Sequence, residues 1–356
     1  MNQVLARTPE ELRRAFKDDG VEAYRADQVL RWLWRRGVHE FEDMSNLPRS
    51  LRADLASRWA TRTLEIEALH CSADGTEKLV LRTADGQRIE SVIIPEEQRR
   101  TLCVSSQVGC SLDCSFCATG RMKLERNLRA EEIVDQVFCA SERLAERGER
   151  LTHLVFLGMG EPLLNLANVV QAIRVLCDPD AAGLSARRVT VSTAGVVPQM
   201  QALGQAVKTR LAVSLHATTD AVRERLVPLN RRFPLAELLE ACRRYPLARR
   251  DRISFEYTLI RGVNDARDDA RRLVGLLHGL RAKVNLIPMN EHPGAPYRRP
   301  DDATVERFAA ELAQSRAPVS IRRSRGDDVF AACGQLANLP TAPTGPAPQA
   351  AGVPVR

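Results

Sequence analysis

Residues 103–120 read CVSSQVGCSLDCSFCATG, and this stretch decides how the rest of the chain is interpreted. Cys110, Cys114 and Cys117 follow a C-x3-C-x2-C spacing in a segment too short and too polar for a core helix. Thiolates this close along a chain can bind one metal centre, and they suit zinc, copper or an iron–sulfur cluster. A structural zinc site has four protein ligands. A cubic 4Fe–4S cluster held by three cysteines leaves one iron without a protein ligand, so that a substrate can bind there. The spacing therefore favours a catalytic cluster.

The same segment carries a family resemblance. The cysteine spacing, with Phe116 before the last cysteine, resembles the radical S-adenosylmethionine (SAM) superfamily. The longer run 101–120, followed by Arg126-Asn127-Leu128, is similar to the dual-specificity adenine-C2 RNA methyltransferases, and the similarity extends to Cys333. The resemblance implies one 4Fe–4S cluster on the three cysteines, with SAM as the second cofactor.

The composition is that of an ordinary globular protein. Of 356 residues, 44% are hydrophobic and 27% are charged. No apolar run approaches the roughly 18 residues of a membrane span, and the first residues lack the apolar core of a secretory signal. Nine cysteines without a signal peptide indicate metal-binding or catalytic thiols, so we expect a cytoplasmic protein. The net charge of +7 suits a polyanionic partner but does not identify one.

Residues 1–62 predict a small helical module. Thr8-Pro9-Glu10-Glu11 forms a capping box, and helices are expected at 24–36 and 51–59. Arginines interleave with Trp32 and Trp34 in the longer helix, which predicts RNA contact by phosphate pairing and base stacking. The alternative is a solvated arginine face over a tryptophan core, and the resemblance favours RNA.

Residues 63–100 predict an antiparallel hairpin or meander that joins this module to the main domain. The apolar period changes to two, and Asp74-Gly75 and Asp85-Gly86 are turn signals. The tail, 340–356, is rich in proline, alanine and glycine and is predicted to be disordered.

Residues 101–339 predict a barrel of alternating strands and helices. Six such units are too few for a closed eight-unit barrel, so we expect an open, partial (β/α)6 barrel, as the resemblance also implies. Strands are expected at 152–157, 188–192, 210–215, 253–259, 283–287 and 318–321. Helices are expected at 130–147, 165–177, 220–226, 235–244, 265–279 and 302–314.

Polar residues stand where predicted strands end, at the edge of the barrel that usually binds ligands. Gly160 would let the backbone approach a ligand, and Glu161 can accept a bond from an ammonium group. By resemblance, this segment binds the amino group of SAM, and residues at other strand ends surround SAM as well: Ser192, Ser214, Leu215, His216 and Asn290. Without the resemblance, each would be a cap or a satisfied loop group, and His216 a core histidine.

Two further cysteines and a glutamate complete the predicted site. Cys333 follows a basic stretch, 322–328, where arginines can hold RNA phosphate and lower the pKa of a thiol. By resemblance, Cys333 carries the transferred methyl group, Cys103 resolves the covalent intermediate as a disulfide, and Glu90 is the base that deprotonates the adenine carbon. The alternative for Glu90 is a solvent-facing side chain. The remaining cysteines are expected to be small buried hydrophobes: Cys71, Cys139, Cys177 and Cys242.

The resemblance implies methylation of C2 in one adenosine at the peptidyl-transferase centre of 23S rRNA and in the adenosine just 3′ of the anticodon in tRNA. It also implies two SAM molecules per turnover and a flavodoxin-type electron donor, and we expect a monomer. Two alternatives stay open. A sibling enzyme that methylates C8 of adenosine has the same cluster and the same pair of methyl-carrying and resolving cysteines. A zinc-stabilised RNA-binding protein without activity would use the three cysteines as structural ligands.

Overall fold

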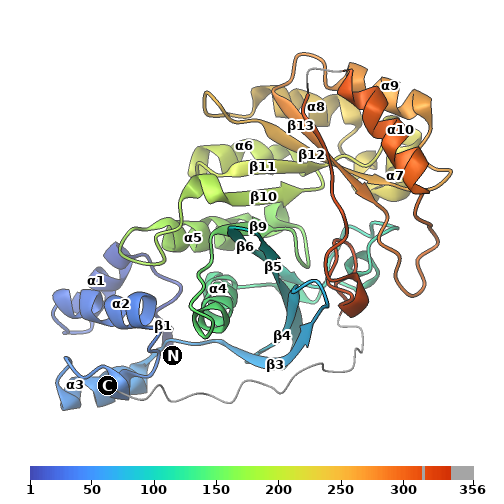
Figure 1. Cartoon of the computed structure of the whole chain (residues 1–356). Coiled ribbons are helices and arrows are strands. Elements are labelled where there is room, and N and C mark those ends of the chain that lie inside the picture. The colour runs from blue at the N-terminus through green and yellow to red at the C-terminus, as the bar shows by residue number, and fades with distance from the viewer. Residues whose placement is uncertain (315–316, 338–356) are drawn as a thin grey trace.

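The computed structural model describes residues 1–314 and 317–337, so the predicted disordered tail lies outside the described residues. A long curved sheet forms the centre of the molecule, and three helices, α1 to α3, form a lobe at one end (Figure 1). None of the helices in the described ranges has the length and apolarity needed to cross a membrane.

The central sheet is continuous from the connector into the barrel. Its ten strands run in the order β14-β13-β12-β11-β10-β9-β6-β5-β4-β3. Neighbours from β6 to β14 pair in parallel, whereas β3 to β6 pair antiparallel. The strands are β3 Leu64–Cys71, β4 Glu77–Thr83, β5 Arg88–Glu96, β6 Arg99–Val104, β9 His153–Phe156, β10 Val189–Thr193, β11 Arg210–Ser214, β12 Ile253–Leu259, β13 Ala282–Pro288 and β14 Val319–Ile321.

Helices follow the parallel strands and cover the outer face of the sheet. They are α4 Ala130–Ala145, α5 Leu166–Cys177, α6 Val197–Ala206, α7 Asp220–Leu226, α8 Leu235–Arg244, α9 Arg267–Leu276 and α10 Asp302–Ala313. Short 3-10 helices lie at Phe41–Asp43, Thr119–Arg121, Pro162–Asn165, Ala186–Arg188, Pro228–Arg231 and Asp327–Val329.

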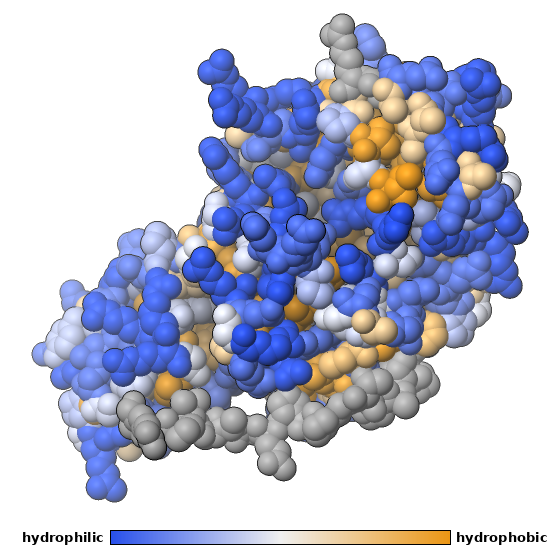
Figure 2. Space-filling view, in the orientation of Figure 1, coloured by the Kyte–Doolittle hydropathy of each residue, from blue (hydrophilic) through white to orange (hydrophobic). Residues whose placement is uncertain are grey.

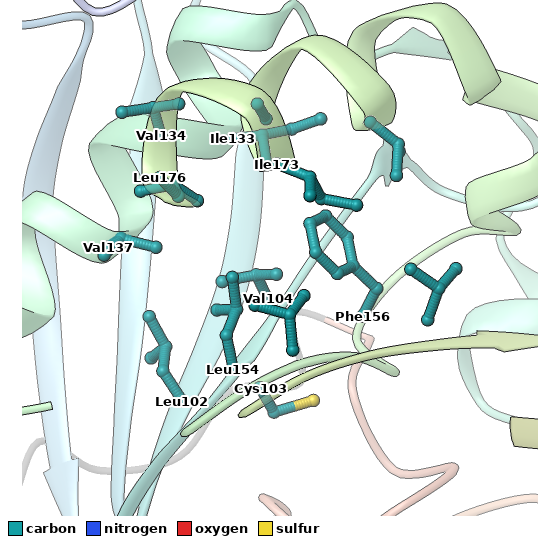
Figure 3. Close-up of a cluster of buried hydrophobic side chains, with 14 of the residues drawn as sticks. Leu102, Cys103, Val104, Ile133, Val134, Val137, Leu154, Phe156, Ile173 and Leu176 are labelled. Atoms are coloured by element: carbon teal, nitrogen blue, oxygen red, sulfur yellow. The ribbon is translucent and has the colours of Figure 1, made fainter. Parts of the chain in front are cut away.

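The core between the helices and the sheet shows which side chains of each strand face the helices and which face the inside of the barrel. Buried residues of α4 and α5, such as Ile133 and Ile173, pack on Leu102 and Phe156 of the sheet (Figure 3). Cys103, the neighbour of Leu102, points to the opposite face of β6 (Figure 3), as alternation along a strand requires. That opposite face is the inner face of the barrel.

The N-terminal lobe contains α1 Pro9–Asp18, α2 Tyr24–Arg36 and α3 Arg49–Arg58. A short parallel pair, β1 Asn2–Gln3 and β2 Trp59–Ala60, joins its two ends. The predicted capping box is confirmed, because Thr8 and Glu11 exchange backbone and side-chain bonds. The helix expected at 51–59 begins two residues earlier and ends one residue earlier, since Trp59 already belongs to β2.

The tryptophans of α2 face inward. Trp32 is buried, donates to Asn46 Oδ1 at 2.5 Å, and has the guanidinium of Arg36 over its ring at 4.2 Å. Trp34 meets Phe138 of α4 edge-on, with ring centroids 5.6 Å apart. The prediction that RNA bases stack on Trp32 is therefore wrong. The helix instead has exposed arginines over a tryptophan core.

The predicted alternation of strands and helices is confirmed, with two additions. Helix α6 lies between β10 and β11, where no helix was expected, and β6 is the first parallel strand of the barrel. The connector strands form the predicted antiparallel meander, which also extends the barrel sheet through the β5–β6 pair. A small pair, β7 Gln107–Val108 with β8 Arg126–Asn127, flanks the cysteine loop.

Candidate active site

One cleft at the carboxyl ends of the parallel strands gathers most of the predicted site residues. They come from the cysteine loop, from four strand ends and from the C-terminal loop: Cys110, Cys114, Cys117, Gly160, Glu161, Ser192, Ser214, His216, Asn290 and Cys333. Leu215 is buried beside this cleft, while Cys103 and Glu90 lie on the neighbouring strands β6 and β5. The cleft thus unites residues separated by more than 200 positions in the sequence.

The cysteine loop closes tightly around two glycines. Gly109 has φ +77°, and a Cβ there would lie 2.0 Å from the carbonyl oxygen of Lys123. A Cβ on Gly120 would lie 2.7 Å from the carbonyl oxygen of Cys114. Only glycine fits such close backbone approaches. The loop therefore holds the three thiols on one side of the cleft.

The three thiols are the ligand type that an iron–sulfur cluster requires. Among the described residues, no group of three or more His, Cys, Asp or Glu side chains forms a ready site for one ion. A cubic cluster does not need such convergence, because each cysteine binds a different iron. The donor set is thiolate only, which is the ligand type of these clusters.

Glu161 is a fixed carboxylate at the end of β9. Its Oε2 accepts from Ala194 N at 2.8 Å and its Oε1 accepts from Leu163 N at 3.0 Å. Burial raises the pKa of Glu161 to about 6, although both hydrogen bonds oppose that rise. Next to it, Gly160 has φ +93°, and a Cβ there would lie 2.4 Å from Gln107 Cβ. The two backbone donors and this close packing thus hold the Glu161 carboxyl group in one position.

Ser192 and His216 line the cleft from β10 and β11. Ser192 Oγ is buried and has no hydrogen-bond partner among the described residues, which marks a place for a ligand atom. His216 has φ +58°, and its Nδ1 accepts from Thr258 N at 3.0 Å. Burial, helped by Arg223, lowers the pKa of His216 to about 3. The imidazole is therefore neutral, with its ring edge-on to Phe116 at 4.8 Å.

Arg223, which connects two of these strand ends, was not predicted from the sequence. Its guanidinium donates to Ala194 O at 2.6 Å, to Leu215 O at 3.1 Å and to Ser214 O at 3.1 Å. Burial lowers the pKa of Arg223 to about 10, so the group stays charged. In the sequence it is one arginine of a short charged helix and looks like an exposed residue.

The loop that carries Cys333 is fastened to the cysteine loop and to β13. Ala118 N donates to Gly334 O at 2.7 Å, and Thr119 Oγ1 donates to Leu336 O. Asn290 Nδ2 donates to Cys333 O at 2.9 Å. Asn290 therefore helps to position Cys333. The prediction placed Asn290 beside SAM and did not include this contact.

Cys333 lies close enough to Cys103 in the barrel to influence its pKa. Burial raises the pKa of Cys103 well above its usual range, and the nearby Cys333 adds to that rise. Although Cys333 has exposed surface, the protein atoms around it desolvate its thiolate and raise the pKa to about 11, against the opposite influence of Arg322. Arg322 thus lowers this pKa as predicted, but desolvation outweighs that effect and the net shift is upward.

Glu90 lies in the interior, which removes the solvent-facing alternative. It is 0% exposed on β5, and its Oε1 lies 3.1 Å from Nζ of Lys78, which is also 0% exposed on β4. The angles at this contact are poor, so these atoms and Glu90 Oε2 have no hydrogen-bond partner among the described residues. A buried ion pair with unused hydrogen-bonding capacity is a feature of functional sites. Lys78 was not predicted from the sequence.

The four other cysteines divide into two groups. Cys139 and Cys242 are buried as expected, whereas Cys71 and Cys177 are only partly buried. The expectation of small buried hydrophobes is thus confirmed for the first two alone.

Comparisons with known proteins agree with the geometry. A family model for the radical SAM superfamily matches residues 104–274, and one for the ribosomal RNA large subunit methyltransferase N-terminal domain matches residues 3–60. The dual-specificity RNA methyltransferase RlmN of Geotalea uraniireducens (strain Rf4) is 50% identical over 329 residues, which cover 92% of this chain and 94% of the relative.

Two further matches have similar extent. The RlmN protein of Syntrophotalea carbinolica (strain DSM 2380 / NBRC 103641 / GraBd1) is 52% identical over 331 residues, covering 92% of this chain and 88% of the relative. The crystal structure of a radical SAM methyltransferase from Sphaerobacter thermophilus superposes with a TM-score of 0.91 at 45% identity, covering 94% of this chain and 99% of that one. The chain therefore belongs to the dual-specificity RNA methyltransferase family of the radical SAM superfamily.

Proposed function

We propose that this radical SAM RNA methyltransferase methylates C2 of A2503 in 23S rRNA and of A37 in tRNA. The observation that carries the proposal is the single cleft in which the three-cysteine loop, the carboxylate of Glu161 and the Cys333 loop meet. The printed name of the relatives supports two kinds of RNA substrate.

The cleft residues fit both expected cofactors. Cys110, Cys114 and Cys117 offer three thiolates to a 4Fe–4S cluster. Glu161 offers a fixed carboxylate to the amino group of SAM, and Ser192 Oγ offers an unused hydrogen-bonding group. We assign Ser214, Leu215, His216 and Asn290 to the same cofactor pocket. When bound, the cluster and SAM supply the one-electron chemistry that an electron-poor aromatic carbon requires.

The protein's own thiols transfer the carbon and release the product. Cys333 accepts the methyl group as a nucleophile and presents it to C2 of an adenine that has left its stack. Glu90, paired with Lys78, takes the proton from C2. The thiolate of Cys103 then attacks Sγ of Cys333, so that a disulfide forms while the bond from that sulfur to the product carbon breaks. A thiol reductant restores both cysteines.

The division of labour along the chain follows the same proposal. We assign RNA binding to residues 1–62, the base Glu90 to the connector 63–100, and the chemistry to residues 101–339. A monomer in the cytoplasm that takes electrons from a flavodoxin-type reductant is the simplest setting for this activity.

The test is a methylation assay without oxygen. Cluster-loaded protein is given SAM, a reductant and unmodified rRNA or tRNA fragments, and the nucleosides are analysed by mass spectrometry. We expect 2-methyladenosine from both RNAs, and its loss in Cys333→Ala. 8-Methyladenosine would assign the protein to the C8 sibling instead. A colourless protein that contains zinc and lacks iron and sulfide would support the RNA-binding alternative.

A further inference from the structure

The end of the barrel opposite the cleft carries a row of basic residues on its inner face. Alternation along a strand sets this face: Ser192 and Ser214 line the cleft, so residues two or four positions earlier on the same strand face the same way. Arg99, Arg210 and Lys283 have this orientation near the amino-terminal ends of β6, β11 and β13, and Arg188 and Arg252 directly precede β10 and β12. We call Arg99, Arg188, Arg210, Arg252 and Lys283 the basic rim.

Most of the rim has no side-chain partner among the described residues. The side chains of Arg188, Arg210, Arg252 and Lys283 form no hydrogen bond or ion pair with any residue that the structure describes. Arg99 makes only a 3.9 Å contact with Glu96. By contrast, Arg243 and Arg244 on the outer helix α8 are both paired with Glu240. The rim therefore gathers several unpaired positive charges at one end of the barrel.

The rim cations lie close enough to influence the groups between them. Burial lowers the pKa of His153, at the start of β9, and Arg99, Arg188 and Arg210 lower it further. Burial also lowers the pKa of Lys283; Glu256 opposes this, while Arg322, Arg210 and Arg99 add to it. Charges contributed by distant parts of the sequence thus converge on one opening.

The inner face between rim and cleft is lined by short side chains. Thr101, Val155 and Thr190 remain partly exposed, whereas their outward-facing neighbours Leu154 and Val191 are 0% exposed. Closed eight-stranded barrels fill this layer with bulky branched residues. Here the layer has smaller side chains that stay partly exposed, and the same face of β6 continues to Cys103, two residues beyond Thr101.

The N-terminal lobe docks at the same end of the barrel. Arg13 Nη2 lies 3.0 Å from Asp180 Oδ2, and Arg35 Nη2 donates to Pro179 O at 2.6 Å. Both acceptors belong to the segment between α5 and β10, which leads directly into Arg188. The exposed arginines of α2 and the basic rim therefore lie on connected surfaces.

We propose that the basic rim binds the phosphates of the RNA strand on either side of the target adenosine. The nucleotide then reaches Cys333 along the inner face of the barrel, from the amino-terminal ends of the strands. This inference rests on the proposed function and adds the route and the contacts of the RNA. Unpaired guanidinium and ammonium groups match a phosphate backbone, and the opposite end of the barrel is left to the cofactors.

The test compares salt dependence of RNA binding, using cluster-loaded protein and an unmodified tRNA anticodon stem-loop. The rim variant Arg188→Ala/Arg210→Ala/Lys283→Ala removes three positive charges. The control Arg231→Ala/Arg243→Ala/Arg244→Ala removes the same charge from the outer surface near α8. Each lost phosphate contact lowers the slope of log K against log salt by about 0.7 to 0.9.

We expect the rim variant to lose about two units of slope and to bind at least tenfold more weakly at moderate salt, with SAM affinity and cluster absorbance unchanged. The control should keep the wild-type slope. Equal slopes for the rim variant and wild type, or equal losses for rim and control, would overturn the proposal. Failure of the proposed function has a different signature: wild type that binds RNA through the rim without methylating it.

Discussion

At the scale of single residues, the buried pair of Lys78 and Glu90 makes the clearest prediction. Lys78→Met leaves an unpaired carboxylate in the interior, and breaking a buried ion pair costs about 3–5 kcal/mol of unfolding free energy. The double variant Lys78→Met/Glu90→Leu removes both charges and should recover most of that loss. Urea unfolding of wild type, both single variants and the double variant gives the coupling. Additive effects would show that the two groups do not interact.

A second residue-scale prediction concerns Glu161. Glu161→Gln keeps the size of the side chain but removes the charge that we assign to the ammonium group of SAM. A hydrogen bond to a charged group contributes about 1.5–3 kcal/mol, so SAM affinity should fall by roughly 10- to 100-fold. Calorimetric titration of cluster-loaded protein measures it, with Glu240→Gln on the outer helix α8 as control. Unchanged affinity would remove Glu161 from the SAM site.

The residues that could be predicted from the sequence are those that stand in a recognisable local pattern, with roles that the family resemblance supplies. The three cysteines stand within eight positions, and Glu161 and Ser192 directly follow apolar strands. Lys78 and Arg223 could not be found in this way. Lys78 meets Glu90 through the pairing of β4 with β5, and Arg223 reaches carbonyl groups of two loops that the fold alone brings together.

At the scale of elements, the turn between β3 and β4 acts as a clamp on the Cys333 loop. Asp74 Oδ2 accepts from Gly326 N at 3.1 Å, and Ala73 N donates to Asp328 Oδ2 at 3.1 Å. Asp74→Ala should loosen residues 326–336 and reduce methylation while leaving the cysteine loop intact. Hydrogen exchange is expected to rise in that segment, with normal iron content. Unaltered exchange together with lower activity would point to another cause.

The elements also show where sequence patterns stop being informative. The strands from β9 to β14 were predicted because each is a compact apolar run between turn signals. Helix α6 was missed because its sequence, VPQMQALGQA, contains an internal glycine and little helical periodicity. Gly204 is present for packing: a Cβ there would lie 2.7 Å from Pro246 Cγ. Such a contact with a distant segment cannot be seen in the sequence.

At the scale of the whole molecule, docking of the N-terminal lobe on α4 should depend on pH through His39. Its Nδ1 lies 3.3 Å from Glu142 Oε1, and this interaction raises the pKa of His39, while burial and Arg62 oppose it. The raised pKa means that protonated His39 stabilises the fold fully below the unfolded value of about 6.5. That stabilisation is lost as pH rises through the higher folded pKa.

Thermal unfolding between pH 6 and 8 tests this sign. Wild type should lose stability relative to His39→Gln as the pH rises, because the glutamine cannot carry the charge. Glu142→Gln should abolish the same difference. Parallel curves for wild type and His39→Gln would show that the histidine does not titrate within the interface.

The hydrogen bond from Ala118 N to Gly334 O links the cysteine loop to the Cys333 loop, so the order of one loop is coupled to the order of the other. Any ligand that rigidifies residues 110–120 also reduces the entropy that the Cys333 loop has left to lose, so binding at one loop favours order at the other. Linkage makes this reciprocal: a methyl group or an adenine held at Cys333 must tighten cofactor binding by the same factor. Occupancy of either loop therefore raises the affinity of the other loop for its own ligand.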